Sequence, residues 1–68
     1  MIKTGQYQHF KGNFYQVLYI AKHSETEEYL VVYHPDKDIH NIWVRPLVMF
    51  DETIIREGKE IKRFTFIK

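Results

Sequence analysis

Two short phrases of the sequence carry the side chains best suited to acid–base chemistry or recognition. The first contains His23, Ser24 and Glu25, and the second contains Trp43 and Arg45. Polar groups of these kinds cost free energy when they are buried without partners, so they belong either to a satisfied network or to a surface that meets a ligand. The two phrases are therefore the first candidates for a functional site.

In an extended chain alternate residues share a face, so His23 and Glu25 would lie together and Ser24 would point away. A histidine beside a carboxylate can transfer a proton or polarise a ligand. The alternative is a structural turn in which Ser24 and Thr26 bond the local backbone and Glu25 holds His23. Because adjacency alone does not make His23 and Ser24 a nucleophile–base pair, we assign no catalytic residue.

Trp43 and Arg45 share one face of the same expected strand. A guanidinium can stack on an aromatic ring or grip a carboxylate or phosphate with two hydrogen bonds, and Trp and Arg are typical of interface hot spots. If the neighbouring Ile42 and Val44 point into the core, both side chains stand outside. The alternative buries Trp43 and places Arg45 in an ion pair. The acids considered for that pair are Glu25, Glu27 and Asp51.

Three further aromatic or titratable side chains are candidate neighbours of this patch: Tyr7, His9 and Tyr33. Tyr7 and His9 share a face of the first expected strand and, with Lys11, could line the same surface as Trp43. The alternative is a core tyrosine and a histidine whose hydrogen bonds are satisfied internally.

A possible metal-ligand pattern surrounds one turn, where His34, Asp36, Asp38 and His40 alternate along the chain. The spacing would place them together only if the segment were extended, and Pro35 favours a tight turn instead. We therefore predict neither a metal site nor a cofactor.

The elements that must position these residues read as short strands separated by turns. The expected strands are Gln6–Phe10, Phe14–His23, Glu28–His34, Ile39–Arg45 and Ile61–Ile67. Simple alternation would place Val17 and Tyr19 on the same face of the second strand. Residues 47–55 fit either a helical turn started by Pro46 or a further strand. This pattern predicts a single, mainly all-β domain over residues 1–68, a small antiparallel SH3-like barrel of five or six strands. An open sheet with one short helix is the alternative.

Composition agrees with one small core. The 68 residues include no cysteine, which excludes disulfides and thiolate metal sites, but they include five Tyr, five Phe and one Trp, which predict an aromatic core. Neither a signal peptide nor a transmembrane span is evident, so we expect a cytoplasmic protein without a membrane partner. The net charge of +1 hides a basic start, an acidic middle and a basic end.

Phrases along nearly the whole chain carry a family resemblance. They are Gly5-x-Tyr7-x-His9-Phe10-Lys11-Gly12, Tyr15-x-Val17, Ala21-x-His23-Ser24-Glu25-Thr26, Val31-Val32-Tyr33, Trp43-Val44-Arg45-Pro46, Met49-Phe50-x-Glu52 and Arg63-Phe64. In this order they resemble the bacterial family of domains of unknown function 1653. The resemblance implies a stand-alone small domain without an assigned activity. Two departures are Gln6 and Gln8, where the family often has arginine, and the turn at His34–Lys37, where it often has a Leu-Tyr-Gly phrase.

We therefore predict a non-enzymatic binding module. The candidate binding residues are Trp43, Arg45, His23 and Glu25, with Tyr7, His9 and Tyr33 as neighbours. Mixed charge and many tyrosines favour a peptide, a protein or a small anionic ligand over a nucleic-acid duplex. One alternative is single-stranded nucleic-acid binding through aromatic stacking and the terminal Lys and Arg residues. Another is a small enzyme that uses the His23–Glu25 pair.

Overall fold

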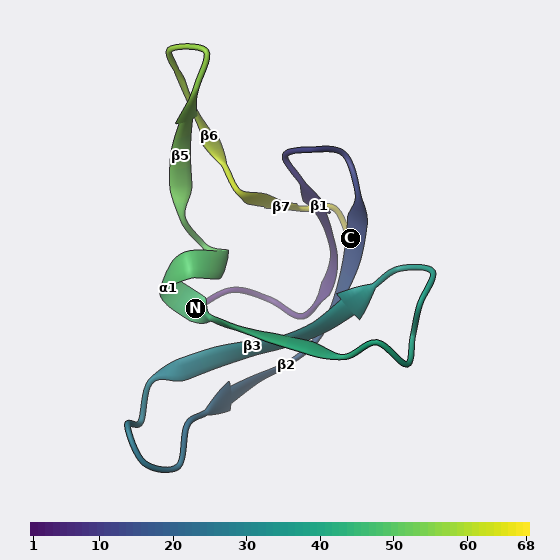
Figure 1. The fold of residues 1–68 in the computed structure, drawn as a ribbon, viewed down its shortest axis with the longest axis vertical. Helices are drawn as coiled ribbons and strands as arrows, with labels where there is room; N and C mark the ends of the chain where they lie inside the picture. The colour runs from purple at the N-terminus through teal and green to yellow at the C-terminus, as the bar shows by residue number, and fades with distance from the viewer.

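The computed structural model describes all 68 residues and contains seven strands and one short helix (Figure 1). The elements are β1 (Gly5–His9), β2 (Phe14–Lys22), β3 (Tyr29–Pro35), β4 (Trp43–Pro46), α1 (Leu47–Phe50), β5 (Thr53–Arg56), β6 (Lys59–Lys62) and β7 (Phe64–Phe66). The predicted all-β class is confirmed, and so is the helical turn after Pro46. No helix has the length and apolar character needed to cross a membrane.

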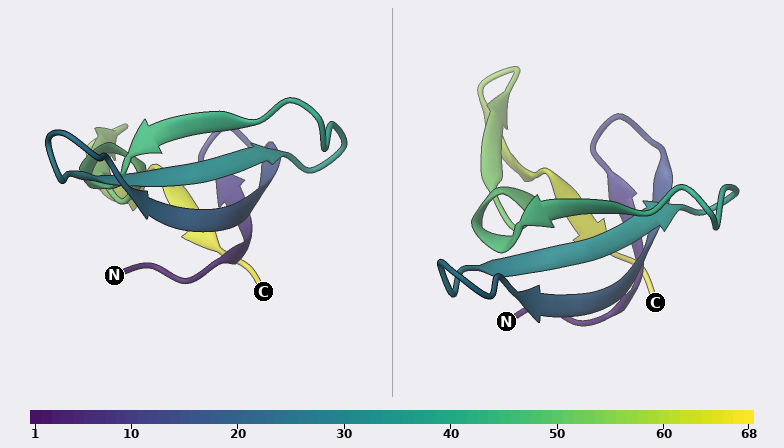
Figure 2. Two further views of the ribbon diagram at one scale, coloured as in Figure 1. Left: turned by 90° about the horizontal axis from the view of Figure 1, so that it is seen from below. Right: turned by 60° about the horizontal axis from the view of Figure 1, so that its bottom comes forward.

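Five strands form one antiparallel sheet in the order β4-β3-β2-β1-β7, and β5 and β6 form a separate hairpin. The hairpin extends away from the sheet in Figure 1, and Figure 2 shows how strongly the sheet curls. No ladder joins the edge strands β4 and β7, so the sheet is curled but open. The inner side of the curl holds the core.

Aromatic rings make up most of this core. The six buried apolar residues are Tyr7, Val17, Val31, Tyr33, Phe50 and Phe64. Phe50 of α1 stacks on Phe64 with ring centroids 4.0 Å apart, and the rings of Tyr7 and Tyr33 meet Phe50 edge-on at 5.3 and 5.4 Å. Edge-on and offset contacts of this kind add to the stability gained from buried area alone. The aromatic core predicted from composition is present.

A bulge in β2 changes which side chains face this core. The pairing of β2 with β3 shifts by one residue between Val17 and Tyr19. An extra residue in one strand reverses the alternation beyond it, so Ile20 packs against the core and Tyr19 is 67% exposed. The expectation that Val17 and Tyr19 share a face is therefore wrong.

The register of β4 on β3 places Trp43 and Arg45 on the inner side of the sheet. Trp43 pairs with Tyr33, and Arg45 pairs with Val31. Directly paired residues point to the same face, and both partners on β3 are buried. The condition considered from the sequence, that Ile42 and Val44 point into the core, is not met, since they are 47% and 62% exposed. Trp43 and Arg45 consequently lie over the core rather than on the outer surface.

Candidate functional site

A row of three aromatic rings forms where β1 pairs with β7. The ladder sets His9 opposite Phe64, and their ring centroids are 4.9 Å apart. The ring of Phe10, the next residue in the chain, has its centroid 4.4 Å from that of His9. The main-chain N–H of Phe10 donates to the carbonyl of Arg63, which fixes the row to the segment before β7.

Cationic side chains lie over both ends of this row. The guanidinium carbon of Arg45 is 5.7 Å from the centroid of Phe64. The Phe10 ring has the Lys11 ammonium at 5.8 Å and the Arg56 guanidinium at 5.1 Å. Because Arg56 belongs to β5, its contact connects the projecting hairpin to the turn between β1 and β2. We call Lys11, Arg45, Arg56 and Arg63, together with the three rings, the cationic face.

Carboxylates neutralise little of this charge. The protein has two salt bridges, Arg63 to Glu52 at 2.6 Å and Lys62 to Asp51 at 2.8 Å. Arg45 takes part in neither, so the ion pair considered for it from the sequence is not formed. Of the four cations on the face, only Arg63 has a carboxylate partner.

The protonation of His9 reflects these surroundings. Burial lowers the pKa of the His9 imidazole below its usual value, and the positive charges of Arg63, Lys11 and Arg45 lower it further. Neutral His9 therefore sits within a region of positive potential.

Arg45 is held in place by the core itself. Its Nε donates a hydrogen bond of 3.2 Å to the hydroxyl of Tyr33, and its guanidinium lies over Phe64, which stacks on Phe50. The side-chain hydrogen bonds of the protein leave its two terminal nitrogens unused. These nitrogens can therefore bind a carboxylate or phosphate with two parallel hydrogen bonds.

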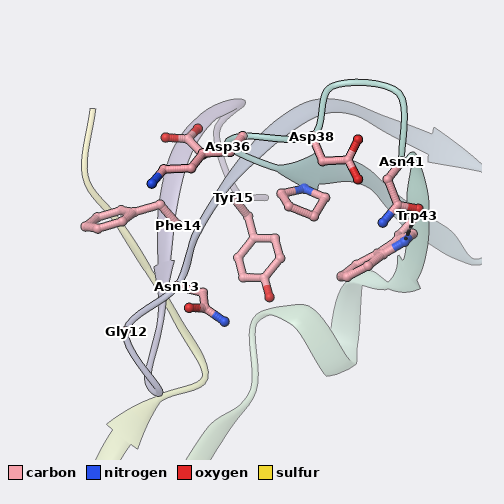
Figure 3. Close-up of a pocket in the computed structure, with 10 residues that line it drawn as sticks. Gly12, Asn13, Phe14, Tyr15, Asp36, Asp38, Asn41 and Trp43 are labelled. Carbon is pink, nitrogen blue, oxygen red and sulfur yellow. Dashed lines mark hydrogen bonds between the residues drawn. The ribbon is translucent and has the colours of Figure 1, made fainter.

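Beside the cationic face lies a cleft of about 520 Å³ between the β1–β2 turn and the β3–β4 loop (Figure 3). Its lining residues are Gly12–Tyr15, Pro35–Asp38, Asn41 and Trp43. Trp43 is 40% exposed, and its indole nitrogen donates to the side-chain oxygen of Asn41 at 2.9 Å. Tyr15 lies 5.9 Å from Trp43, 5.6 Å from Phe64 and 6.3 Å from His9. The Tyr15 ring thus borders both the cleft and the cationic face.

The structure brings together four of the residues proposed from the sequence: Trp43, Arg45, Tyr33 and His9. Tyr33 is buried and supports the other side chains from below. Tyr7 lies apart from them in the core, where it is 5% exposed and its hydroxyl donates to the carbonyl of Lys3. Burial raises the pKa of that hydroxyl.

His23 and Glu25 do not join this group. They occupy the turn between β2 and β3, where Nδ1 of His23 accepts the main-chain N–H groups of Glu25 at 3.1 Å and of Thr26 at 3.3 Å. The hydroxyl of Thr26 in turn accepts from the N–H of Glu28. This is a capped turn, with the His23 ring as the main acceptor.

The alternating His and Asp residues after β3 do not converge on a common point. His34 is buried, and its Nδ1 lies 2.7 Å from the carbonyl oxygen of Pro35. Asp36 accepts a hydrogen bond from the amide of Gln6. No group of three or more potential metal ligands is found in the structure.

Contributors that were not selected as site residues from the sequence include Phe10, Phe64, Arg63, Arg56 and Tyr15. The alternation of Tyr15 with Val17 on the apolar face of the second strand was a usable signal for Tyr15. Arg56 gave none, because its place depends on how the hairpin packs against Phe10.

Comparison with known proteins identifies relatives of the whole chain. A family model described as "Protein of unknown function (DUF1653)" matches residues 5–66. Among solved structures, the chain is similar to the crystal structure of a DUF1653 protein from Bordetella bronchiseptica. The two are 29% identical, the TM-score is 0.83, and the match covers 97% of this chain and 87% of that chain. No curated protein matches.

Proposed function

This chain belongs to the DUF1653 family, and from the geometry of its cationic face we propose that it is a non-enzymatic binding module for an anionic ligand. The ligand would be an acidic peptide, an acidic protein surface or a small anion. The observation that carries the proposal is the state of Arg45, a cation fixed over the core without a carboxylate partner.

Two physical features suit this face to anions. Arg45 is already ordered by Tyr33 and Phe64, so binding costs less side-chain entropy than ordering a free arginine would. The neighbouring charges of Lys11 and Arg56 raise the local positive potential, which attracts an anion and speeds its association. A bound anion would also relieve the repulsion among these cations.

The location of the His23–Glu25 pair favours binding over catalysis. One ring nitrogen of His23 is already used by the backbone of its own turn. Proton transfer through that pair would compete with the hydrogen bonds that hold the turn. The cationic face offers no serine and no carboxylate other than Glu52, which pairs with Arg63.

The proposal is tested by heteronuclear NMR titration with inorganic phosphate and with a short polyglutamate peptide at constant ionic strength. We expect saturable shifts for His9, Phe10 and the Arg45 side chain. Hydrogen bonds to charged groups contribute about 1.5–3 kcal/mol, so Arg45→Gln should weaken binding about ten- to a hundredfold.

Lys22→Gln is the matched control, because it also removes one positive charge but lies outside the cationic face, at the last residue of β2 and over Tyr29. Thermal unfolding of each variant verifies that it is folded. The proposal fails if neither anion gives saturable shifts, or if Arg45→Gln and Lys22→Gln weaken binding equally.

A further inference from the structure

The cleft and the cationic face are neighbours that differ sharply in chemistry, and Tyr15 borders both. Resting on the proposed anion-binding function, we propose that the ligand is a nucleotide, with its planar base in the cleft and its phosphate on the cationic face. The nucleotide is either free or one unit of a single strand, since both present the same base and phosphate.

The shape and walls of the cleft suit a flat heterocycle. Its volume of about 520 Å³ falls within the range of small-molecule sites, which is about 300–1,000 Å³. Trp43 and Tyr15 line it, and Figure 3 shows their rings next to each other along one wall, with centroids 5.9 Å apart. Stacking on exposed aromatic rings is the main way in which proteins hold unpaired bases.

Polar groups around the cleft can read the edge of a base. Asn13, Asn41 and Asp38 line the cleft and are labelled in Figure 3. The side-chain oxygen of Asn41 is occupied by the indole N–H of Trp43, which leaves its amide NH₂ as a donor. Asn13 adds an amide that makes no side-chain hydrogen bond in the structure. A plain phenyl ring could not use these groups, whereas a base carries matching donors and acceptors.

Charge orients the ligand across the two regions. Asp36 and Asp38 line the cleft, with Lys37 between them, so a phosphate is disfavoured inside it. On the other side of Tyr15, Arg45 lies over Phe64, which is only 5.6 Å from the Tyr15 ring. The base therefore enters the cleft and the phosphate turns toward Arg45.

The test compares four probes by calorimetric titration: adenosine 5′-monophosphate, ribose 5-phosphate, phenyl phosphate and adenosine. Stacking of one base changes affinity by about tenfold or more, so we expect adenosine 5′-monophosphate to bind at least that much more tightly than ribose 5-phosphate. Phenyl phosphate should bind more weakly than the nucleotide because it has no base edge. Adenosine has no phosphate, so it should bind more weakly than adenosine 5′-monophosphate by the part of the affinity that Arg45 supplies.

Two variants separate the base contacts from the phosphate contacts. Trp43→Ala should bring adenosine 5′-monophosphate down to the affinity of ribose 5-phosphate. Because Trp43 also packs on Tyr33, Asn13→Ala in the exposed β1–β2 turn provides an independent test. It should weaken nucleotide binding several-fold and leave ribose 5-phosphate binding unchanged.

The possible outcomes distinguish the two proposals. If all three phosphates bind equally and depend on Arg45, anion binding stands and the nucleotide inference is overturned. Tighter binding of phenyl phosphate would overturn it in favour of an aromatic phosphate such as phosphotyrosine. If no phosphate binds, the nucleotide inference fails, and the anion-binding proposal fails with it only if polyglutamate gives no saturable shifts either. Where the nucleotide binds as expected, a short adenine oligonucleotide shows whether the ligand is a free nucleotide or part of a single strand. Tighter binding than the mononucleotide indicates a single strand, and equal or weaker binding indicates the free nucleotide.

Discussion

Removing the Phe50 side chain should unfold most of the protein. Phe50 is 1% exposed, stacks on Phe64 at 4.0 Å and receives the edges of Tyr7 and Tyr33. A buried Phe→Ala change costs about 3–5 kcal/mol. The single core of a chain this small supplies only about 3–5 kcal/mol in total. The loss therefore matches the whole stability, and Phe50→Ala should be largely unfolded at room temperature.

The loss of stability can be measured on a series of variants that remove more or less of the Phe50 side chain. Their unfolding by urea or heat is followed by the fluorescence of Trp43. Phe50→Leu keeps part of the volume and should cost about 1–2 kcal/mol, which lowers the midpoint by roughly 4–8 °C for each kcal/mol in a domain of this size. Val48→Ala is the control on the same helix, because Val48 is 80% exposed, and it should change stability by less than about 0.5 kcal/mol. A Phe50→Ala protein as stable as Val48→Ala would refute the assignment of Phe50 and Phe64 as the centre of the core.

Two other perturbations test the charge around His9 and the backbone at Gly5, the first residue of β1. Burial, together with Arg63 and Lys11, lowers the pKa of His9, so the unfolded chain binds the proton more readily. The contribution of His9 to the free energy of unfolding should be fully present above the unfolded pKa of about 6.5 and be lost as the pH falls from there toward the folded pKa. The urea midpoint should therefore fall less steeply with pH in His9→Gln than in the unmodified protein. An identical pH dependence in the two proteins would contradict the assignment. Gly5 has φ +132, and an added Cβ would lie 2.7 Å from the carbonyl oxygen of Lys68. Gly5→Ala should therefore lower the free energy of unfolding by several kcal/mol. Gly58 also has a positive φ but has open space around it, so Gly58→Ala should cost about 1–2 kcal/mol. Equal thermal midpoints for the two variants would show that the contact with Lys68 does not determine the cost at Gly5.

Local signals in the sequence were sufficient for the class of the fold. Pro46 ends β4 and starts the helical turn, as its fixed φ and missing N–H predict. The bulge in β2 gave no such signal, because alternation of side chains assumes a regular strand. The sequence also did not show which side chains of β4 face the core. Val44 has the residue type of a core position, and only the pairing of Trp43 with Tyr33 shows that Trp43 faces inward.

The candidate site divides in the same way. Trp43 and Arg45 could be selected from residue type and spacing alone, since both belong to one strand and share one face. His23 and Glu25 were locally consistent with either a site or a turn, and only the direction of the His23 ring distinguishes these arrangements. The contribution of Arg56 depends on a contact between distant segments, which no local pattern contains.

The arrangement of cations on the face explains how positive charge is kept available. Each contact between a cation and a ring contributes about 0.5–2 kcal/mol, which offsets part of the repulsion among Lys11, Arg45 and Arg56 without neutralising them. Arg63 differs: its Nε is buried without a partner, and its terminal nitrogen is paired with Glu52. The carboxylate therefore serves the arginine whose Nε is buried without a hydrogen-bond partner. Rings rather than acids support the other three, and this choice keeps the face electropositive toward an incoming anion.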